Sequence, residues 1–130
     1  MRASRLLGIQ DGQTAIVTVT ACTVLAPRRA ARSCLMRAVQ ANGTELLTIE
    51  GPSEGGRLHP LREAFQEHHG LQCDFCTPGM RLTALDLLQT NPRPTKAETR
   101  QGLSAVLCRC TGYQGFVRAV EAATLRIAGC

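Results

Sequence analysis

Four of the seven cysteines fall into two close pairs, and these pairs are the residues best suited to chemistry. Two residues separate Cys73 from Cys76, one separates Cys108 from Cys110, and 31 residues lie between the pairs. Thiols this close in sequence can bind one metal ion or two adjacent ones, and a hairpin of helices can bring two such loops together. A site of four thiolates selects zinc or an iron-sulfur cluster. The spacing therefore favours a metal site over disulfides and leaves the metal open.

The residues that flank the two pairs indicate which metal. Cys73-Asp-Phe-Cys76-Thr-Pro-Gly-Met and Cys108-Arg-Cys110-Thr-Gly-Tyr closely resemble the two signatures of the helical [2Fe-2S] domain in molybdenum hydroxylases. That family includes xanthine dehydrogenase, aldehyde oxidase and carbon monoxide dehydrogenase, and the resemblance covers roughly residues 21–123. It implies that the four cysteines bind a [2Fe-2S] cluster. It also implies that Gln72 contacts a molybdopterin cofactor held by a large subunit.

A second, weaker set of candidate ligands lies nearer the N-terminus. Cys22 and Cys34, with 11 residues between them, resemble the third and fourth ligands of the plant-type [2Fe-2S] cluster in the family's N-terminal β-grasp domain. The complete pattern is C-x4-C-x2-C followed by a distant cysteine, but residues 1–21 contain no cysteine. We therefore expect a truncated or rearranged ferredoxin-like domain with an incomplete set of ligands. A wrong start or a frameshift in the source sequence would explain it.

Composition limits the size of the core and the kinds of partner. The chain has 130 residues and only 3% aromatic residues, so it can form one domain or two very small ones that gain from a metal staple. Seven cysteines without a signal-peptide pattern favour thiolate ligands in a reducing, cytoplasmic compartment. The net charge is +5, but the main arginine cluster, between residues 28 and 37, has no interleaved aromatic residues. We expect no nucleic-acid partner and, because no apolar run reaches about 20 residues, no membrane span.

The elements before residue 60 read as β-structure. Residues 15–20 are rich in β-branched side chains and predict a strand. Asn42-Gly43 lies between two apolar segments and predicts a hairpin, with Leu46–Ile49 as its returning strand. The Gly- and Pro-rich residues 51–56 read as a linker. We therefore expect two domains, a partial β-grasp domain over residues 1–53 and a helical domain over residues 54–130.

The helical domain is predicted from start and stop signals. Pro60 can occupy the first position of a helix that ends near Gly70, and Thr77-Pro78 predicts a second helix with Thr77 as its N-cap. That helix should stop at Asn91-Pro92. Thr95-x-x-Glu98 is a capping box that opens a third helix toward Leu107, and a fourth follows Gly112. The fold class is therefore α+β, with a four-helix cluster-binding bundle after an incomplete β-grasp domain.

The resemblance implies an electron-transfer subunit with no catalytic residue of its own. In the family, electrons pass from molybdenum on a large subunit, through the clusters, to FAD on a medium subunit. The substrate is set by the large subunit and cannot be read here. Two other hypotheses fit the residues. One is an interaction module in which zinc staples the helices together, and the other is a degenerate, non-functional remnant of the subunit.

Overall fold

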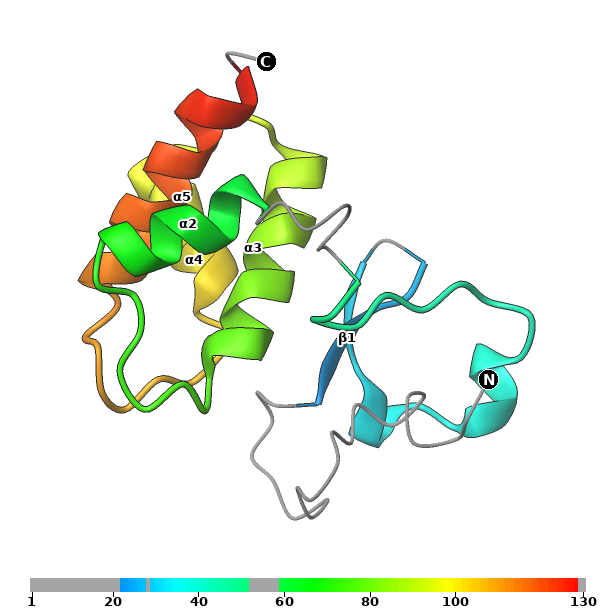
Figure 1. Cartoon of the computed structure of the whole chain (residues 1–130). Helices are drawn as coiled ribbons and strands as arrows, with labels where there is room; N and C mark the ends of the chain where they lie inside the picture. Colours follow the sequence, from blue (N-terminus) through cyan, green and yellow to red (C-terminus); the bar gives the residue numbers. More distant parts are fainter. Residues whose placement is uncertain (1–21, 28, 52–58, 129–130) are drawn as a thin grey trace.

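The computed structural model describes residues 22–27, 29–51 and 59–128 and combines a small sheet with several helices (Figure 1). The elements are, in chain order, strands β1 (Thr23–Leu25) and β2 (Ala30–Arg32), 3-10 helices η1 (Ser33–Leu35) and η2 (Ala38–Ala41), and helices α2 (Pro60–Glu67), α3 (Thr77–Thr90), α4 (Lys96–Leu103) and α5 (Gln114–Ala128). The strand predicted over residues 15–20 lies outside the described residues. None of the described helices is both long and apolar enough to cross a membrane.

The sheet is a short antiparallel pair packed against a helix. Thr23 lies opposite Arg32, and Leu25 lies opposite Ala30. Leu47 adds a single antiparallel bridge to Leu25, with N-H···O distances of 2.9 and 3.0 Å. All three residues of β1 are buried, because this strand lies beside α3 (Figure 1).

The predicted hairpin around Asn42-Gly43 is wrong. The residues before the turn form η2, in which the side-chain oxygen of Gln40 accepts a hydrogen bond of 2.9 Å from the N-H of Arg37. Gly43 does adopt the positive φ, 74°, that a tight turn needs. Because a helical turn precedes it, no strand is available for Leu46–Ile49 to pair with across the turn. The segment instead reaches β1 through Leu47 alone.

Helices α2 and α3 begin close to their predicted starts. Pro60 is the first residue of α2, and the Nδ1 atom of His59 accepts a hydrogen bond of 3.2 Å from the N-H of Leu61. Helix α3 begins at Thr77, so its N-cap is Cys76 and the prediction is wrong by one residue. The Thr77 hydroxyl donates instead to the Asp74 carboxylate, at 3.4 Å. The helix stops just before Asn91-Pro92, as predicted.

Helices α4 and α5 follow the sequence signals at their starts more closely than at their ends. The capping box is confirmed: the Glu98 N-H donates to Thr95 Oγ1 at 3.2 Å, and the Thr95 N-H donates to Glu98 Oε2 at 2.7 Å. Helix α4 ends at Leu103, short of the predicted Leu107. Helix α5 starts two residues after Gly112, and Leu125 near its end is 76% exposed.

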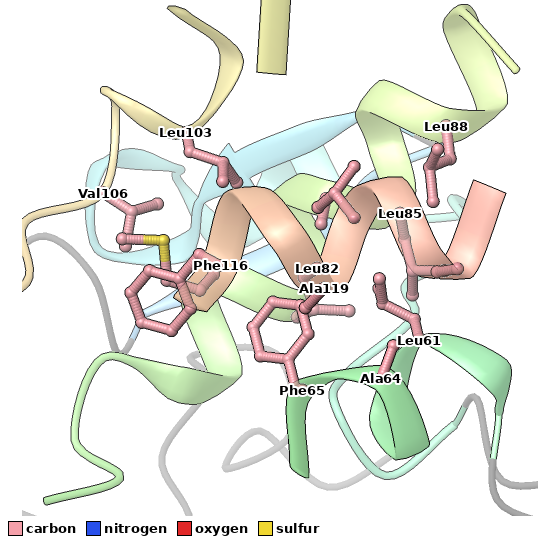
Figure 2. Packing of buried hydrophobic residues seen from close by; sticks show 14 of the residues in the cluster. Leu61, Ala64, Phe65, Leu82, Leu85, Leu88, Leu103, Val106, Phe116 and Ala119 are labelled. Carbon is pink, nitrogen blue, oxygen red and sulfur yellow. The ribbon is translucent and has the colours of Figure 1, made fainter. Parts of the chain in front are cut away.

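The core lies between the helices and extends to β1. The rings of Phe65 in α2 and Phe116 in α5 are 5.4 Å apart, with Leu82 and Ala119 close to them (Figure 2). Leu25 belongs to the same cluster of buried apolar side chains. Burial at about 25 cal/mol per Å² makes this shared cluster the main source of stability.

Polar contacts also fasten the sheet to the helices. Asp86 in α3 forms an ion pair with Arg29 at 3.0 Å, and its other oxygen accepts the N-H of Ala30 at 3.0 Å. Arg32 donates to the carbonyl oxygen of Ala105 at 2.6 Å. Residues from both sides of the predicted boundary therefore pack together. The division at residues 53 and 54 falls in the undescribed residues 52–58 and stays a prediction.

Candidate metal centre

The first cysteine pair lies on the loop between α2 and α3. Cys73 is exposed, whereas Cys76 is buried and is the N-cap of α3. Asp74 has a φ of 60°, a left-handed conformation that aspartate tolerates better than most residues. This turn brings both thiols to the end of α3 where backbone N-H groups lack helical partners and favour negative charge.

The second pair lies on the loop between α4 and α5. Cys108 is buried and Cys110 is exposed, so each loop offers one inner and one outer thiol. The Tyr113 hydroxyl accepts a hydrogen bond of 2.8 Å from the Cys108 N-H and donates one of 2.9 Å to the Val106 carbonyl oxygen. The Thr111 N-H points at the Cys108 sulfur from 3.4 Å. These contacts hold the backbone around Cys108 in one conformation.

The two loops meet, and the thiols pair between loops. The Sγ atoms of Cys73 and Cys110 are 3.5 Å apart, and the thiols of Cys76 and Cys108 are hydrogen-bonded to each other. Across the described part of the chain, no three His, Cys, Asp or Glu side chains are grouped as ligands of one metal ion. The arrangement is two pairs of sulfurs, one at the surface and one inside.

This donor set fits an iron-sulfur cluster with two iron atoms. Two sulfurs about 2.3 Å from one tetrahedral metal would be about 3.8 Å apart, close to the 3.5 Å between Cys73 and Cys110. Two such pairs supply the four thiolates that a [2Fe-2S] cluster takes. The structure thus brings together all four cysteines of the predicted helical site.

The inner thiols differ in how readily they lose a proton. Burial, together with the hydrogen bond that the Cys76 thiol donates to Cys108, raises the pKa of Cys76 to about 12. Burial is the largest single influence on Cys108 and opposes its ionisation, but hydrogen bonds from the hydroxyl and N-H of Thr111, the Cys110 N-H and the Cys76 thiol together outweigh it and lower the pKa of that thiol. The pKa of Cys110 is raised, first by its hydrogen bond with Cys73. Of Cys76, Cys108 and Cys110, Cys108 is therefore the one whose surroundings stabilise a thiolate.

The other predicted site residues are Gln72, next to the metal centre, and Cys22 and Cys34, which are not part of it. Gln72 is exposed beside Cys73. Cys22 and Cys34 are brought together, with 3.1 Å between their Sγ atoms, and this contact with Cys22 raises the pKa of Cys34. The cysteine pattern of the sequence does not indicate these contacts of Thr111 and Tyr113 with Cys108. Their place directly after Cys110, in a turn with Gly112, was the available signal.

The fold and the geometry of the thiols fit an iron-sulfur protein, and comparisons with known proteins show the family. The [2Fe-2S] binding domain family matches residues 48–121. The xanthine dehydrogenase iron-sulfur-binding subunit of Escherichia coli O157:H7 is 40% identical over 122 residues, which cover 92% of this chain and 76% of that one. The chain belongs to this family of [2Fe-2S] subunits of the xanthine dehydrogenase and aldehyde oxidoreductase type.

Two further comparisons agree in sequence and in fold. The nicotine 6-hydroxylase small subunit of Paenarthrobacter nicotinovorans is 53% identical over 100 residues, or 77% of this chain. The match spans only 60% of that relative's length. The crystal structure of quinoline 2-oxidoreductase from Pseudomonas putida 86 superposes with a TM-score of 0.83 at 40% identity, covering 94% of this chain and 77% of the other. The mixed helical and small-sheet fold is therefore that of the iron-sulfur subunit.

Proposed function

We propose that this chain is the electron-transfer subunit of a molybdenum hydroxylase, carrying electrons from molybdenum on a large subunit toward FAD on a medium subunit. The cluster ligands are Cys73, Cys76, Cys108 and Cys110. The observation that carries this proposal is the meeting of two distant loops, with Cys73 and Cys110 3.5 Å apart. Helices α2 to α5 form the cluster-binding bundle, and β1 and β2 belong to a partial β-grasp domain.

Pairing between loops determines how the ligands are shared. With Cys73 beside Cys110 and Cys76 beside Cys108, each iron would take one thiolate from each loop. Losing one cysteine would then loosen both loops. When bound, the cluster accepts and donates single electrons, and the protein sets its potential through ligation, hydrogen bonds and burial. The Thr111 N-H and hydroxyl beside Cys108 favour the reduced, more negative state.

The outer pair of thiols marks the edge that would face a partner. Cys73 and Cys110 are exposed, and so is the neighbouring Gln72. Phe75 and Leu107, which adjoin ligands in the sequence, are 42% and 70% exposed. Apolar side chains left open around a polar centre are typical of a protein interface. We propose that the molybdopterin subunit covers this edge and that Gln72 reaches its cofactor there.

Thiolate ligands need a reducing environment until the metal is bound, which favours a cytoplasmic location. The four thiols alone would also suit a zinc-stapled module, but the match to the [2Fe-2S] binding domain family does not favour that alternative. Zinc would hold the loops together without colour or redox activity.

Iron content and spectroscopy test the proposal. The purified chain should contain about two irons on the helical site, absorb visible light, and give a paramagnetic signal after one-electron reduction. Cys73→Ser and Cys110→Ser should each lose most of the iron, whereas Cys130→Ser, a control outside the proposed ligand set, should keep it. A colourless protein containing zinc would reject the electron-transfer function.

A separate experiment tests the interface. Leu107→Ser should keep the iron and the visible spectrum but weaken binding of the molybdopterin subunit by about tenfold, as expected for loss of one interface side chain worth roughly 1.4 kcal/mol. Leu125→Ser is the matched control, because Leu125 is similarly exposed at 76% on α5. Equal loss of binding in both variants would contradict the proposed edge.

A further inference from the structure

Cys22 and Cys34 form a thiol pair outside the metal centre. They are 12 positions apart, yet their Sγ atoms are 3.1 Å apart. The antiparallel pairing of Thr23 with Arg32 and the 2.9 Å hydrogen bond from the Ser33 N-H to the Cys22 carbonyl hold the two ends of this segment together. Cys22 is buried and Cys34 is exposed. The hairpin of β1 and β2 therefore fixes the two sulfurs near each other.

This pair does not fit a plant-type [2Fe-2S] cluster. With Cys22 as the third ligand, the pattern C-x4-C-x2-C places the first two ligands at positions 14 and 19. Those residues are Thr14 and Val19. Valine has no donor atom, and a threonine hydroxyl is a hard ligand where iron and sulfide favour thiolate. Of the other five cysteines in the sequence, four are the proposed ligands of the metal centre, so only Cys130 could join this pair. Three thiols are fewer than the four that a [2Fe-2S] cluster takes.

We propose that Cys22 and Cys34 form a reversible disulfide in place of half a cluster. A disulfide needs an S-S distance of about 2.05 Å, so the sulfurs must approach by about 1 Å. Side-chain rotation can supply that movement while the strand pairing stays intact.

The oxidant for this step is a small disulfide such as oxidised glutathione. The exposed Cys34 thiol loses its proton, and its sulfur attacks one glutathione sulfur, releasing the first glutathione thiolate and forming a mixed disulfide. Cys22 then loses its proton and attacks the Cys34 sulfur, which releases the second glutathione. The protein loses two protons and two electrons, and oxidised glutathione is reduced to two thiols. Excess reduced glutathione reverses both exchanges.

Tryptic mapping of the iron-loaded full chain tests the proposal directly. Trypsin cuts after Arg5, Arg28, Arg32 and Arg37, so the two cysteines fall on separate peptides, residues 6–28 and 33–37. After treatment with oxidised glutathione and alkylation of remaining thiols, the two peptides should appear joined and lighter by two hydrogens. Reduced glutathione should separate them. Iron should stay near two atoms per chain throughout.

Serine variants complete the test. Cys22→Ser and Cys34→Ser should abolish the joined peptide and leave the iron content unchanged, while Cys130→Ser should change neither. Four irons per chain that fall to two in Cys22→Ser would overturn the proposal, because the pair would then hold a cluster. So would alkylation of both thiols after oxidation, or a link from Cys34 to Cys130. Unchanged iron content in Cys73→Ser and Cys110→Ser would count against the proposed function and leaves the test of this disulfide unaffected.

Discussion

Removing the Tyr113 hydroxyl should loosen the loop that carries Cys108. This oxygen accepts a hydrogen bond from the Cys108 N-H at 2.8 Å and donates one to the Val106 carbonyl at 2.9 Å. Tyr113→Phe keeps the ring, which packs edge-on against Phe116 at 6.1 Å. The substitution therefore removes two hydrogen bonds and little else.

The size of the effect follows from those two bonds. Each is worth roughly 0.5–1.5 kcal/mol net, and the groups left behind belong to a partly buried loop. We expect Tyr113→Phe to lower the free energy of unfolding by about 2 kcal/mol, or roughly 30-fold in the folding equilibrium. Because the loop presents two ligands, iron should also leave faster.

Two measurements check this prediction. Urea unfolding of the iron-loaded chain gives the loss of stability, and bleaching of the visible absorption by a chelator gives the rate of iron release. Thr124→Val is the matched control, because it removes one hydroxyl whose 2.8 Å bond lies within α5. A Tyr113→Phe protein within about 0.5 kcal/mol of the parent, with unchanged iron release, would refute the positioning role.

Three further predictions concern the helices. Gly115→Ala would place a Cβ 2.8 Å from a backbone carbonyl oxygen in the turn after α2, and it should lower the free energy of unfolding by about 1–3 kcal/mol. The added Cβ of Gly102→Ala meets a leucine side chain at 3.2 Å, so this variant should cost less or stabilise α4. Equal urea midpoints for the two variants would contradict this. Thr95→Ala, which removes the N-cap of α4, should lower the free energy of unfolding by about 0.5–2 kcal/mol, and Thr95→Ser should lower it much less. Similar losses of stability in both variants would argue against the capping role of the Thr95 hydroxyl. Burial and a nearby arginine lower the pKa of His59 below 6.5, so as the pH falls this histidine is protonated in the unfolded chain before it is protonated in the folded chain. The melting temperature should therefore fall as the pH drops below about 6.5. His59→Asn, which can cap α2 without titrating, should make the melting temperature less dependent on pH in this range.

Much of the helical part could be predicted because its signals are local. Pro60, the Thr95 capping box and Asn91-Pro92 each fix a helix end through one turn of backbone, and all three appear where expected. The spacing of the cysteines indicated two loops of ligands. The spacing could not indicate which thiols pair. It is compatible with Cys73 sharing an iron with Cys76 of the same loop and equally with Cys73 sharing one with Cys110 of the other loop.

The failures come from contacts that no local pattern encodes. Asn42-Gly43 makes its turn, but η2 before it removes the strand that a hairpin needs, and Leu47 pairs with β1 instead. Leu125 continues the apolar spacing of α5 and is nevertheless exposed. The role of Tyr113 depends on its φ of 67°, which folds the side chain back toward Cys108 and which the residue type does not announce.

Four thiols from two loops should bind one two-iron cluster. The most direct test is iron content, combined with the paramagnetic signal of the reduced protein, for the parent chain and for Cys73→Ser and Cys110→Ser. We expect about two irons per chain and one paramagnetic signal in the parent chain, and loss of both in each variant. Zinc in place of iron, or full iron content in both variants, would contradict it.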